Sequence, residues 1–400
     1  MERSSCSYRI YHRYDNRLCC SICRSLILEK KTRHYYDFSL LIITIVLVSF
    51  GLVMIFSSSS YMAQTKFNDD LHFLSRQGRA VIVGVILMLI ISKLDYKLLI
   101  AKFKFLPVRL CSLAYIGALA LQILVLFIGQ DYNGAKRWIL IPVFGTFQPS
   151  ELSKIAVIIF TAFLCYQAPR VLDRPAGFIR NCIYVGPIIV LIAKENLSSS
   201  IIVAAIFFVI CFVTGRKHWY YYVIAVLAIA GLAAALYFGQ GYRTERVDIW
   251  LNLETHPKGY QILQGLYAIA SGGLFGTGLG NSMQKLGNIP ESYNDMIFTI
   301  ICEELGILGA IAVIALFLML IWRILIISVN APDLYGSLIC VGVLVQIAVQ
   351  VALNIAVVTN TIPSTGISLP FISYGGTSVV LLLCEIGLVL SVSGHINYEN

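Results

Sequence analysis

Long apolar stretches separated by short polar connections dominate this sequence. Ten of them are poor in charge, and most reach the roughly 18 residues that a helix needs to cross a hydrocarbon core of about 30 Å. They cover residues 39–62, 79–96, 108–129, 150–167, 181–194, 198–215, 218–238, 297–327, 334–358 and 374–394. Unbroken apolar runs predict helices, because the strands of a membrane barrel alternate in polarity. The expected fold class is therefore all-α: a polytopic integral membrane protein with about ten transmembrane helices.

The composition leaves no room for a large soluble domain. Of the 400 residues, 58% are hydrophobic and only 13% are charged, whereas a soluble domain has about a quarter of its residues charged. We therefore expect one membrane domain over residues 38–395. A basic tail, residues 1–37, precedes it and is expected to be cytoplasmic and poorly ordered. The longest connection, residues 239–296, lies between the seventh and eighth predicted spans and is expected to be ordered.

The distribution of Lys and Arg predicts the orientation in the membrane. Placing the N-terminus in the cytoplasm puts nineteen of the 30 basic residues on the inner side, as the positive-inside rule requires. Ten spans then return the C-terminus to the cytoplasm, and residues 239–296 lie outside. The net charge of +9 is thus explained by topology and by affinity for anionic lipid headgroups. No basic folded module indicates a nucleic-acid partner.

The first polar segment on the outer side, residues 130–154, carries charges next to a predicted helix. Lys136 and Arg137 come before the helix, and Glu151 and Lys154 lie in its first turns. Glu151 and Lys154 are three residues apart, so they share a helix face and can form an ion pair. Such a pair either lines a cavity or anchors the helix at the membrane surface. The sequence leaves both interpretations open.

The second segment, residues 278–298, leads into the eighth predicted span. Asp295 lies where the loop turns into the helix, and Glu291 is four residues earlier. Asp295 is either an acid favoured by the helix dipole or a carboxylate with a chemical role. Glu303 and Glu304 follow inside an apolar span, where each needs a cavity or a partner.

The third segment, residues 359–377, connects the last two predicted spans and has an unusual composition. It contains two prolines, three glycines and many hydroxyl side chains, which cannot form a regular helix. Irregular backbone at membrane depth is tolerated where it is buried in protein or lines a cavity. The alternative is an ordinary connecting loop.

Together these segments resemble the SEDS family (shape, elongation, division and sporulation), which includes FtsW, RodA and SpoVE. The similarity runs from about residue 38 to 394. The matching stretches are Asn133–Trp138, Gln148–Lys154, Gly259–Gln261, Gly278–Phe298, Glu303–Gly306 and Pro363–Ser378. The stretch Gly280–Leu286, with Pro290 and Glu291, is more similar to the FtsW/SpoVE branch than to RodA.

The resemblance implies a peptidoglycan glycosyltransferase that polymerises lipid II at the outer face of the bacterial cytoplasmic membrane. It favours a role in septal wall synthesis during cell division, with an elongation or sporulation paralogue as the alternative. Implied partners are a class B penicillin-binding protein, which supplies the transpeptidase, and other membrane proteins of the division complex. The family's catalytic aspartate corresponds to Asp295. Expected substrate-binding residues are Glu291, Lys136, Arg137, Glu151, Lys154, Gln284, Lys285, Pro363, Pro370, Ser373 and Gly375.

These residue types suit the implied chemistry. The acceptor 4-hydroxyl must lose a proton as it attacks the anomeric carbon, and a positioned carboxylate contributes roughly 10²–10⁴-fold in rate by accepting it. The leaving group is undecaprenyl pyrophosphate, so positive charge replaces the acid that glycoside hydrolysis normally needs. Arg and Lys side chains, or a divalent cation such as Mg²⁺ or Mn²⁺, supply that charge. No metal-ligand set is assigned from the sequence.

Two departures from the family pattern and two rival functions remain. Residues 195–199 replace the family's Pro-Asp-Leu-Gly-Thr motif, so no role is carried to Asn196. Asn294 and Met296 flank the aspartate where relatives have Thr and Phe. A lipid flippase also accounts for charged residues in spans, and a non-catalytic scaffold would make Asp295 and Glu291 dispensable.

Overall fold

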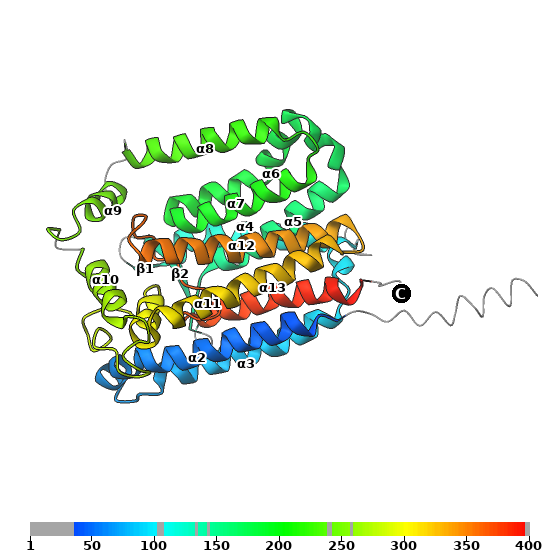
Figure 1. The fold of residues 1–400 in the computed structure, drawn as a ribbon. Coiled ribbons are helices and arrows are strands. Elements are labelled where there is room, and N and C mark those ends of the chain that lie inside the picture. Colours follow the sequence, from blue (N-terminus) through cyan, green and yellow to red (C-terminus); the bar gives the residue numbers. More distant parts are fainter. Residues whose placement is uncertain are drawn as a thin grey trace, which may run out of the picture.

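The computed structural model describes residues 36–101, 108–132, 135–141, 145–237, 242–256 and 259–396 as a bundle of long helices (Figure 1). The long helices are α2 (Phe38–Phe67), α3 (His72–Lys93), α4 (Leu110–Ile128), α5 (Pro149–Gln167), α6 (Pro175–Glu195), α7 (Leu197–Thr214), α8 (Trp219–Tyr237), α11 (Ile297–Val329), α12 (Leu334–Val358) and α13 (Gly376–Gly394). The shorter elements are η1 (Tyr96–Ile100), β1 (Gln130–Tyr132), β2 (Ala135–Ile141), β3 (Gly145–Phe147), η2 (Pro169–Asp173), α9 (Tyr242–Leu251) and α10 (Tyr260–Gly272).

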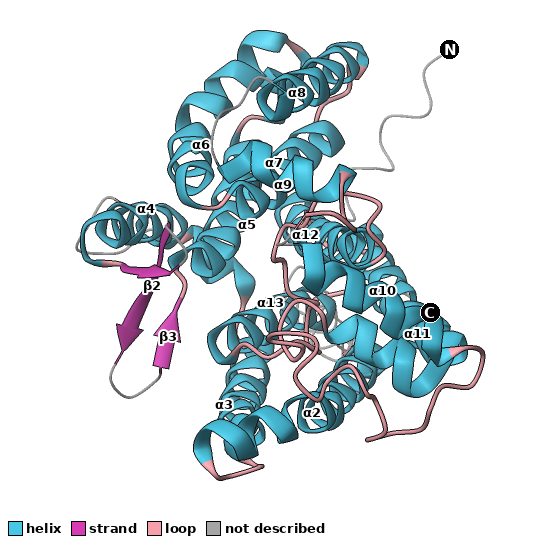
Figure 2. Cartoon of the chain, turned by 90° about the vertical axis from the view of Figure 1, so that its left-hand side faces the viewer, coloured by secondary structure: helices cyan, strands magenta, loops and turns pink. Residues whose placement is uncertain are grey.

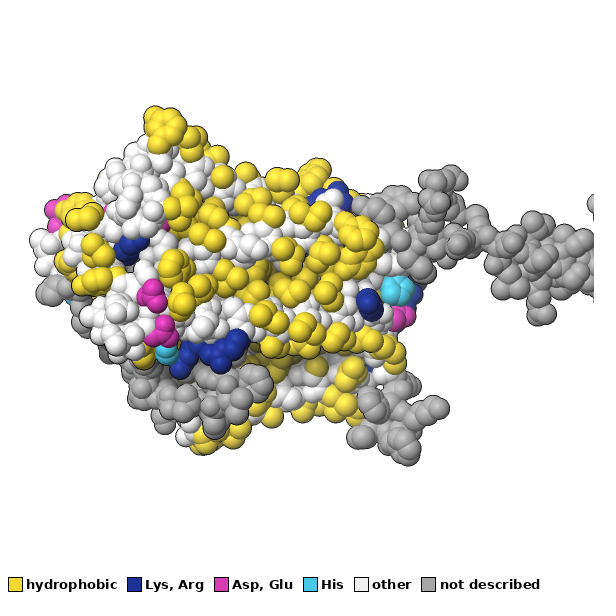
Figure 3. Space-filling view, turned by 90° about the horizontal axis from the view of Figure 1, so that it is seen from below, with side chains coloured by type: hydrophobic (Ala, Val, Ile, Leu, Met, Phe, Trp, Pro, Cys, Tyr) yellow, Lys and Arg dark blue, Asp and Glu magenta, His cyan; other side chains and the backbone are white. Residues whose placement is uncertain are grey.

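The ten long helices match the ten predicted spans in order and closely in extent. Nine helices within the described ranges are long and apolar enough to cross a membrane. The remaining predicted span, residues 218–238, is the seventh in order and corresponds to α8, an apolar helix of 19 residues. Hydrophobic side chains cover the middle of the face shown in Figure 3, and charged side chains lie toward its two ends. The protein is therefore a multi-pass membrane protein.

The helices differ in how much of their surface is buried. In the most apolar 18-residue stretch of α5, 78% of the residues are buried inside the protein, and the share is 61% in both α12 and α13. In α3 only 22% is buried, so most of that helix is left for lipid. The interior therefore lies around α5, α12 and α13. All three helices also carry buried polar side chains, among them Ser150, Ser153, Lys154, Gln346, Gln350, Asn354 and Glu385.

Helix α11 is broken at Gly306. This residue has φ 67° and ψ −168°, a conformation that is essentially restricted to glycine. The break interrupts the hydrogen bonds between successive turns and exposes backbone groups at a buried position. An added Cβ at Gly306 would lie 2.5 Å from the amide nitrogen of Gly276 and 2.5 Å from the carbonyl oxygen of Leu274. The glycine therefore permits another part of the chain to pack directly against the break.

The loop after α10 satisfies those exposed groups. The amides of Thr277 and Gly278 donate to the carbonyls of Glu303 and Glu304 at 2.9 and 3.0 Å. In return, the amides of Ile307 and Leu308 donate to the carbonyls of Gly273 and Leu274 at 2.9 and 3.3 Å. These bonds replace helical ones, and unsatisfied backbone groups at such a position would be costly. The loop 273–278 and the two parts of α11 thus form one unit.

The segments that are predicted to lie outside contain more regular structure than the sequence predicts. Residues 239–296 include α9 and α10, which lie across the end of the bundle opposite to the end of α13 (Figure 1). Residues 130–147 include a small antiparallel sheet of order β1-β2-β3, packed against α4, α5 and α6 (Figure 2). This sheet was not predicted from the sequence, because its strands are short and lie between two apolar helices.

The predicted tail, residues 1–37, lies outside the described residues except for its last two positions. Asp37 belongs to the folded domain. Its side chain accepts a hydrogen bond from the amide of Leu40 and so caps α2. The carboxylate also pairs with Arg323 of α11 at 2.6 Å, which ties the start of α2 to the end of α11.

Candidate active site

Asp295 lies at the junction between the loop 273–296 and α11. Its backbone carbonyl accepts a hydrogen bond from the side-chain amide of Asn354 in α12 at 2.9 Å. A Cβ added at Gly366 would lie 3.8 Å from Oδ2 of Asp295, so the carboxylate faces the third polar segment. The structure thus brings together the second and third segments that the sequence analysis singled out.

The environment of Asp295 makes its carboxylate more basic. Desolvation, with a smaller contribution from the negative charge of Glu291, raises the pKa of Asp295 from its ordinary value of 3.8 to about 6. The positive charge of Arg246 acts in the opposite direction, as do the backbone amides of Asp295 and Met296. A general base is most effective when its pKa approaches the working pH. The pKa of Asp295 therefore suits proton abstraction better than that of an ordinary surface aspartate.

Helices α7 and α9 hold the third segment over Asp295. The guanidinium of Arg246 in α9 donates to the carbonyl of Ser364 at 2.7 Å, and Trp250, one turn later, donates to the carbonyl of Asn360 at 2.9 Å. Ser198, near the start of α7, donates to the carbonyl of Thr365 at 3.3 Å. Arg246 was missed by the sequence analysis, since nothing local distinguishes it from other basic residues of the loop.

Glu291 adopts a left-handed backbone conformation, with φ 51°. Its carboxylate accepts a hydrogen bond from the side-chain amide of Asn294 at 2.9 Å, and its carbonyl accepts one from the amide of Asn294. The loop is joined to the third segment by a bond from the amide of Tyr374 to the carbonyl of Tyr293 at 2.9 Å. These contacts fix the turn that leads to Asp295.

Glu151 and Lys154 form a buried ion pair, with 2.8 Å between Nζ and Oε1. Lys154 is 1% exposed, so the pair does not lie at the membrane surface as a simple anchor would. Ser378 of α13 donates to Glu151 at 3.0 Å. Gln350 of α12 lies 3.5 Å from Nζ of Lys154 and donates to the carbonyl of Ser368 at 3.2 Å. The first and third segments therefore also meet.

A stripe of carboxamides along α12 joins these contacts. Gln346, Gln350 and Asn354 are spaced four residues apart, so they lie on one face of the helix. Gln346 donates to both carboxylate oxygens of Glu385 at 2.9 and 2.8 Å. These four residues were not among the predicted site residues. The signal that could have found them is three amides at helical spacing in an apolar span, together with one acid in the next span.

Gln284 and Lys285 lie in a loop that is built around Glu303 and Glu304. The carboxylate of Glu303 accepts hydrogen bonds from the hydroxyl of Ser282 and from the amides of Met283 and Gln284. Lys285 pairs with Glu304 at 2.8 Å, and both are buried. This arrangement confirms the expectation that each of the two glutamates in the span has a partner.

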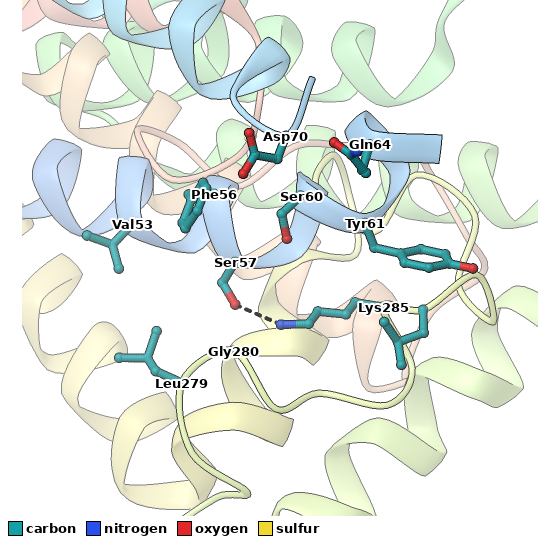
Figure 4. A pocket seen from close by; sticks show the side chains of 11 residues that line it. Val53, Phe56, Ser57, Ser60, Tyr61, Gln64, Asp70, Leu279, Gly280 and Lys285 are labelled. Carbon is teal, nitrogen blue, oxygen red and sulfur yellow. Dashed lines mark hydrogen bonds between the residues drawn. The ribbon is translucent and has the colours of Figure 1, made fainter. Parts of the chain in front are cut away.

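Lys285 also lines a pocket of about 810 Å³ between α2 and the loop. Figure 4 shows its amino group next to the hydroxyl of Ser57, with Phe56 and Leu279 on the walls. The two atoms are 3.1 Å apart. The residues that line this pocket differ from the contacts of Asp295 described above. These contacts therefore do not bring Lys285 together with Asp295, and its role in substrate binding stays a prediction.

The remaining predicted site residues lie in two places. Lys136 and Arg137 are on β2, beside α4, α5 and α6. Pro363 is partly exposed, whereas Pro370, Ser373 and Gly375 form a tight corner before α13. There the hydroxyl of Ser373 accepts from the amide of Leu369 at 2.8 Å, and the amide of Gly375 donates to Gln77 of α3 at 3.1 Å. These three residues shape the third segment, and their roles toward substrate stay predictions.

A divalent cation also stays a prediction. Within the residues that the structure describes, no group of three or more His, Cys, Asp or Glu side chains could hold a metal ion. Mg²⁺ is often bound by one or two carboxylates together with phosphate oxygens of the substrate. Asp295 and Glu291, whose negative charge acts on Asp295, are a pair of carboxylates that such an ion could use.

Residues 38–398 match the family model described as "Cell cycle protein", FtsW/RodA/SpoVE. Stage V sporulation protein E of Bacillus subtilis is 37% identical over 366 residues, which cover 90% of this chain and 98% of that protein. The probable peptidoglycan glycosyltransferase FtsW of Geobacter sp. is 35% identical over 364 residues, covering 90% and 96%. These matches span almost the whole of each relative.

Solved structures agree with the sequence relatives. A chain of a peptidoglycan synthase complex, described as coordinating polymerization and crosslinking, has a TM-score of 0.74 and 27% identity, covering 90% of this chain and 97% of that one. The rod shape determining protein RodA of Thermus thermophilus has the same fold, with a TM-score of 0.66 and 24% identity over 91% of this chain and 98% of that one. Sequence and structure lead to one conclusion: the chain belongs to the FtsW/RodA/SpoVE family of cell cycle proteins.

Proposed function

We propose that this protein is a peptidoglycan glycosyltransferase that polymerises lipid II for septal wall synthesis, with Asp295 as its general base. The observation that carries the catalytic assignment is the position of Asp295. Its carboxylate faces Gly366 of the third segment, and desolvation raises its pKa to about 6. The glycosyltransferase class rests on the family and on relatives that bear this name.

The reaction is a single displacement at the anomeric carbon of the donor. Asp295 accepts the proton of the acceptor 4-hydroxyl as its oxygen forms the new glycosidic bond. The bond from the anomeric carbon to the pyrophosphate oxygen breaks, and undecaprenyl pyrophosphate leaves with the electron pair. One displacement inverts the anomeric centre, so an α-linked donor gives a β-linked polymer. Arg246, close enough to influence Asp295, joins Lys136, Arg137 and Lys154 as a cation that can stabilise the leaving anion.

The orientation follows the distribution of basic residues. Both termini lie in the cytoplasm, and the end of the bundle that carries α9, α10 and Asp295 faces outward. The activated sugar reaches this face already attached to its lipid, so no nucleotide-binding domain is required. A class B penicillin-binding protein is the expected partner, since the similar solved chain belongs to a peptidoglycan synthase complex.

Polymerisation by the purified protein tests the assignment. Asp295→Asn keeps the shape of the side chain but removes its basicity, so it should insert into membranes and bind partners normally while yielding no glycan chains from lipid II on a gel. Asp248→Asn, which changes an exposed carboxylate on α9, is the matched control and should keep the wild-type yield.

Two results would contradict the proposal. Normal polymer from Asp295→Asn would remove Asp295 from the role of base. Movement of lipid II across vesicles by the wild-type protein, without any lengthening of glycan in the presence of its partner, would favour the flippase instead.

A further inference from the structure

Two buried carboxamides on α12 hold the backbone that surrounds the proposed active site. Asn354 is 0% exposed and Gln350 is 2% exposed. They are four residues apart, which corresponds to a rise of about 6 Å along the helix. Each side chain contacts one of two adjacent residues in the third segment, Ile367 and Ser368. Both amides therefore bond to a segment outside α12.

Asn354 joins the two segments that meet at Asp295. Its Nδ2 donates to the carbonyl of Asp295 at 2.9 Å and to the carbonyl of Ile367 at 2.7 Å. Both partners are acceptors, so the amide nitrogen must point toward them. The Oδ1 atom is buried and has no hydrogen-bond partner among the described residues. An aliphatic side chain of similar volume would fill the space without this unpaired oxygen, so the contribution specific to Asn354 is its pair of donated bonds.

Gln350 makes the corresponding connection to Lys154. Its Nε2 donates to the carbonyl of Ser368 at 3.2 Å, and its Oε1 lies 3.5 Å from Nζ of Lys154. Lys154 is held on its other side by Glu151 at 2.8 Å. The rigid helix between Gln350 and Asn354 therefore links a buried cation to the backbone of the proposed base.

We propose that Asn354 and Gln350 are positioning residues that set the distance between the general base Asp295 and the cation Lys154. This inference rests on the proposed function. Residues 367 and 368 form the common support, because each amide bonds to one of their carbonyls. Asn354 controls the placement of the base, and Gln350 controls the placement of the charge that the pyrophosphate meets.

The two residues should therefore give different kinetic effects. Asn354→Ala should lower kcat by about 10²-fold with little change in the KM for lipid II, since a displacement of about 1 Å can cost that much. Gln350→Ala should mainly raise the KM, by about 10-fold, because a charge that contacts the donor in both the ground state and the transition state is misplaced. A purely structural role would lower the amount of folded protein in both variants and leave the kinetic constants of the folded fraction unchanged.

The pH profile supplies a second readout. Without the bond from Asn354, the turn at Asp295 is freer and its carboxylate better hydrated. Its pKa should then fall from about 6 toward the ordinary value, and the acid limb of kcat/KM should move to lower pH. Glu291 and Arg246, the charged groups that influence Asp295, are unchanged in this variant. Loss of folded protein alone would not move the limb.

Asn354→Leu repeats the test without creating a cavity, in case Asn354→Ala fails to fold. Asn330→Ala is the control, since Asn330 is exposed at the other end of α11 and its side-chain amide donates to the carbonyl of Ile326 in its own helix. Wild-type kcat and an unmoved acid limb in both Asn354 variants would overturn the proposal, as would identical effects of the Asn354 and Gln350 variants on kcat and KM. Polymerisation by Asp295→Asn would instead overturn the proposed function, so the two failures are distinguishable.

Discussion

Lys285 and Glu304 form an ion pair of 2.8 Å that is buried between α2, α11 and the outer loop. The hydroxyl of Ser57 donates to both oxygens of Glu304 at 2.7 Å, and Lys285 in turn donates to Ser57. Glu304 also contributes its carbonyl to the hydrogen bonds across the break in α11. One residue thus holds both the loop and the helix in place.

Removing one partner of this pair should destabilise the protein more than removing both. Lys285→Met leaves the Glu304 carboxylate buried without its cation, which should lower the free energy of unfolding by about 3–5 kcal/mol. The double variant Lys285→Met with Glu304→Met removes both charges and should recover most of that loss. Thermal unfolding of the protein in detergent measures both, with Lys66→Met at the exposed end of α2 as the control. A double variant as unstable as the sum of the single ones would show that the charges do not interact.

The pH dependence of polymerisation should report the charges around Asp295. The base must be ionised, and its pKa is raised to about 6, so kcat/KM should fall as the pH decreases through about 6. Glu291→Gln removes a negative neighbour, which lowers the pKa of Asp295 and moves the acid limb to lower pH. Arg246→Gln removes a positive neighbour and moves the limb to higher pH. Shifts of the same sign in both variants would contradict this electrostatic account.

The break in α11 should depend on glycine. Gly306→Ala requires a non-glycine residue at φ 67° and places a Cβ 2.5 Å from backbone atoms of loop 273–278. The strained conformation alone costs about 1–3 kcal/mol, and the collision adds to it, so we expect a lower Tm and loss of activity. Gly117→Ala is the matched control, because nothing lies within 4 Å of the added Cβ in α4. An unchanged Tm in Gly306→Ala would mean that the loop can move away freely.

Lys154 should be essential for stability and for polymerisation, because its ion pair is buried, whereas a lysine in an exposed pair should not be. Lys154→Met removes the cation beside Glu385, which is buried, and Glu151, which is mostly buried. This should cost about 3–5 kcal/mol in stability and abolish polymerisation. Lys97→Met breaks an exposed pair with Asp333 at 3.4 Å and should cost at most about 1 kcal/mol. Comparing the two Tm values and polymer yields checks this expectation. Activity in Lys154→Met near the wild-type level would exclude Lys154 from substrate binding.

Much of the fold could be predicted from the sequence because hydrophobicity alone specifies where a chain crosses a membrane. The predicted span 334–358 coincides with α12, and 297–327 differs from α11 by two residues at its end. The break at Gly306 could not be predicted, since its cause is a loop about thirty residues earlier in the chain. The sheet at residues 130–147 was missed for a similar reason: short strands carry little local signal.

The site was predictable where chemistry is unusual in its local context. Asp295, Glu151 and Lys154 stood out because charged residues are rare at the edge of an apolar span. Gln350 and Asn354 were passed over because amides are less conspicuous than charges, and their partners are backbone carbonyls contributed by another segment. Arg246 could not be chosen from the loop without knowing that α9 packs on residues 360–364.

The interruption of α11 also divides the helix into a short leading piece and a long piece that is sufficient to span the membrane. After Gly306 the helix continues to Val329 and rises about 35 Å, which is enough to cross the hydrocarbon core without help. The leading piece of α11, with Asp295 just before it, is therefore not needed to cross the core. Under the proposed reaction the two products separate by solubility alone: the polyprenyl carrier returns to the oily phase, while the sugar polymer extends into water.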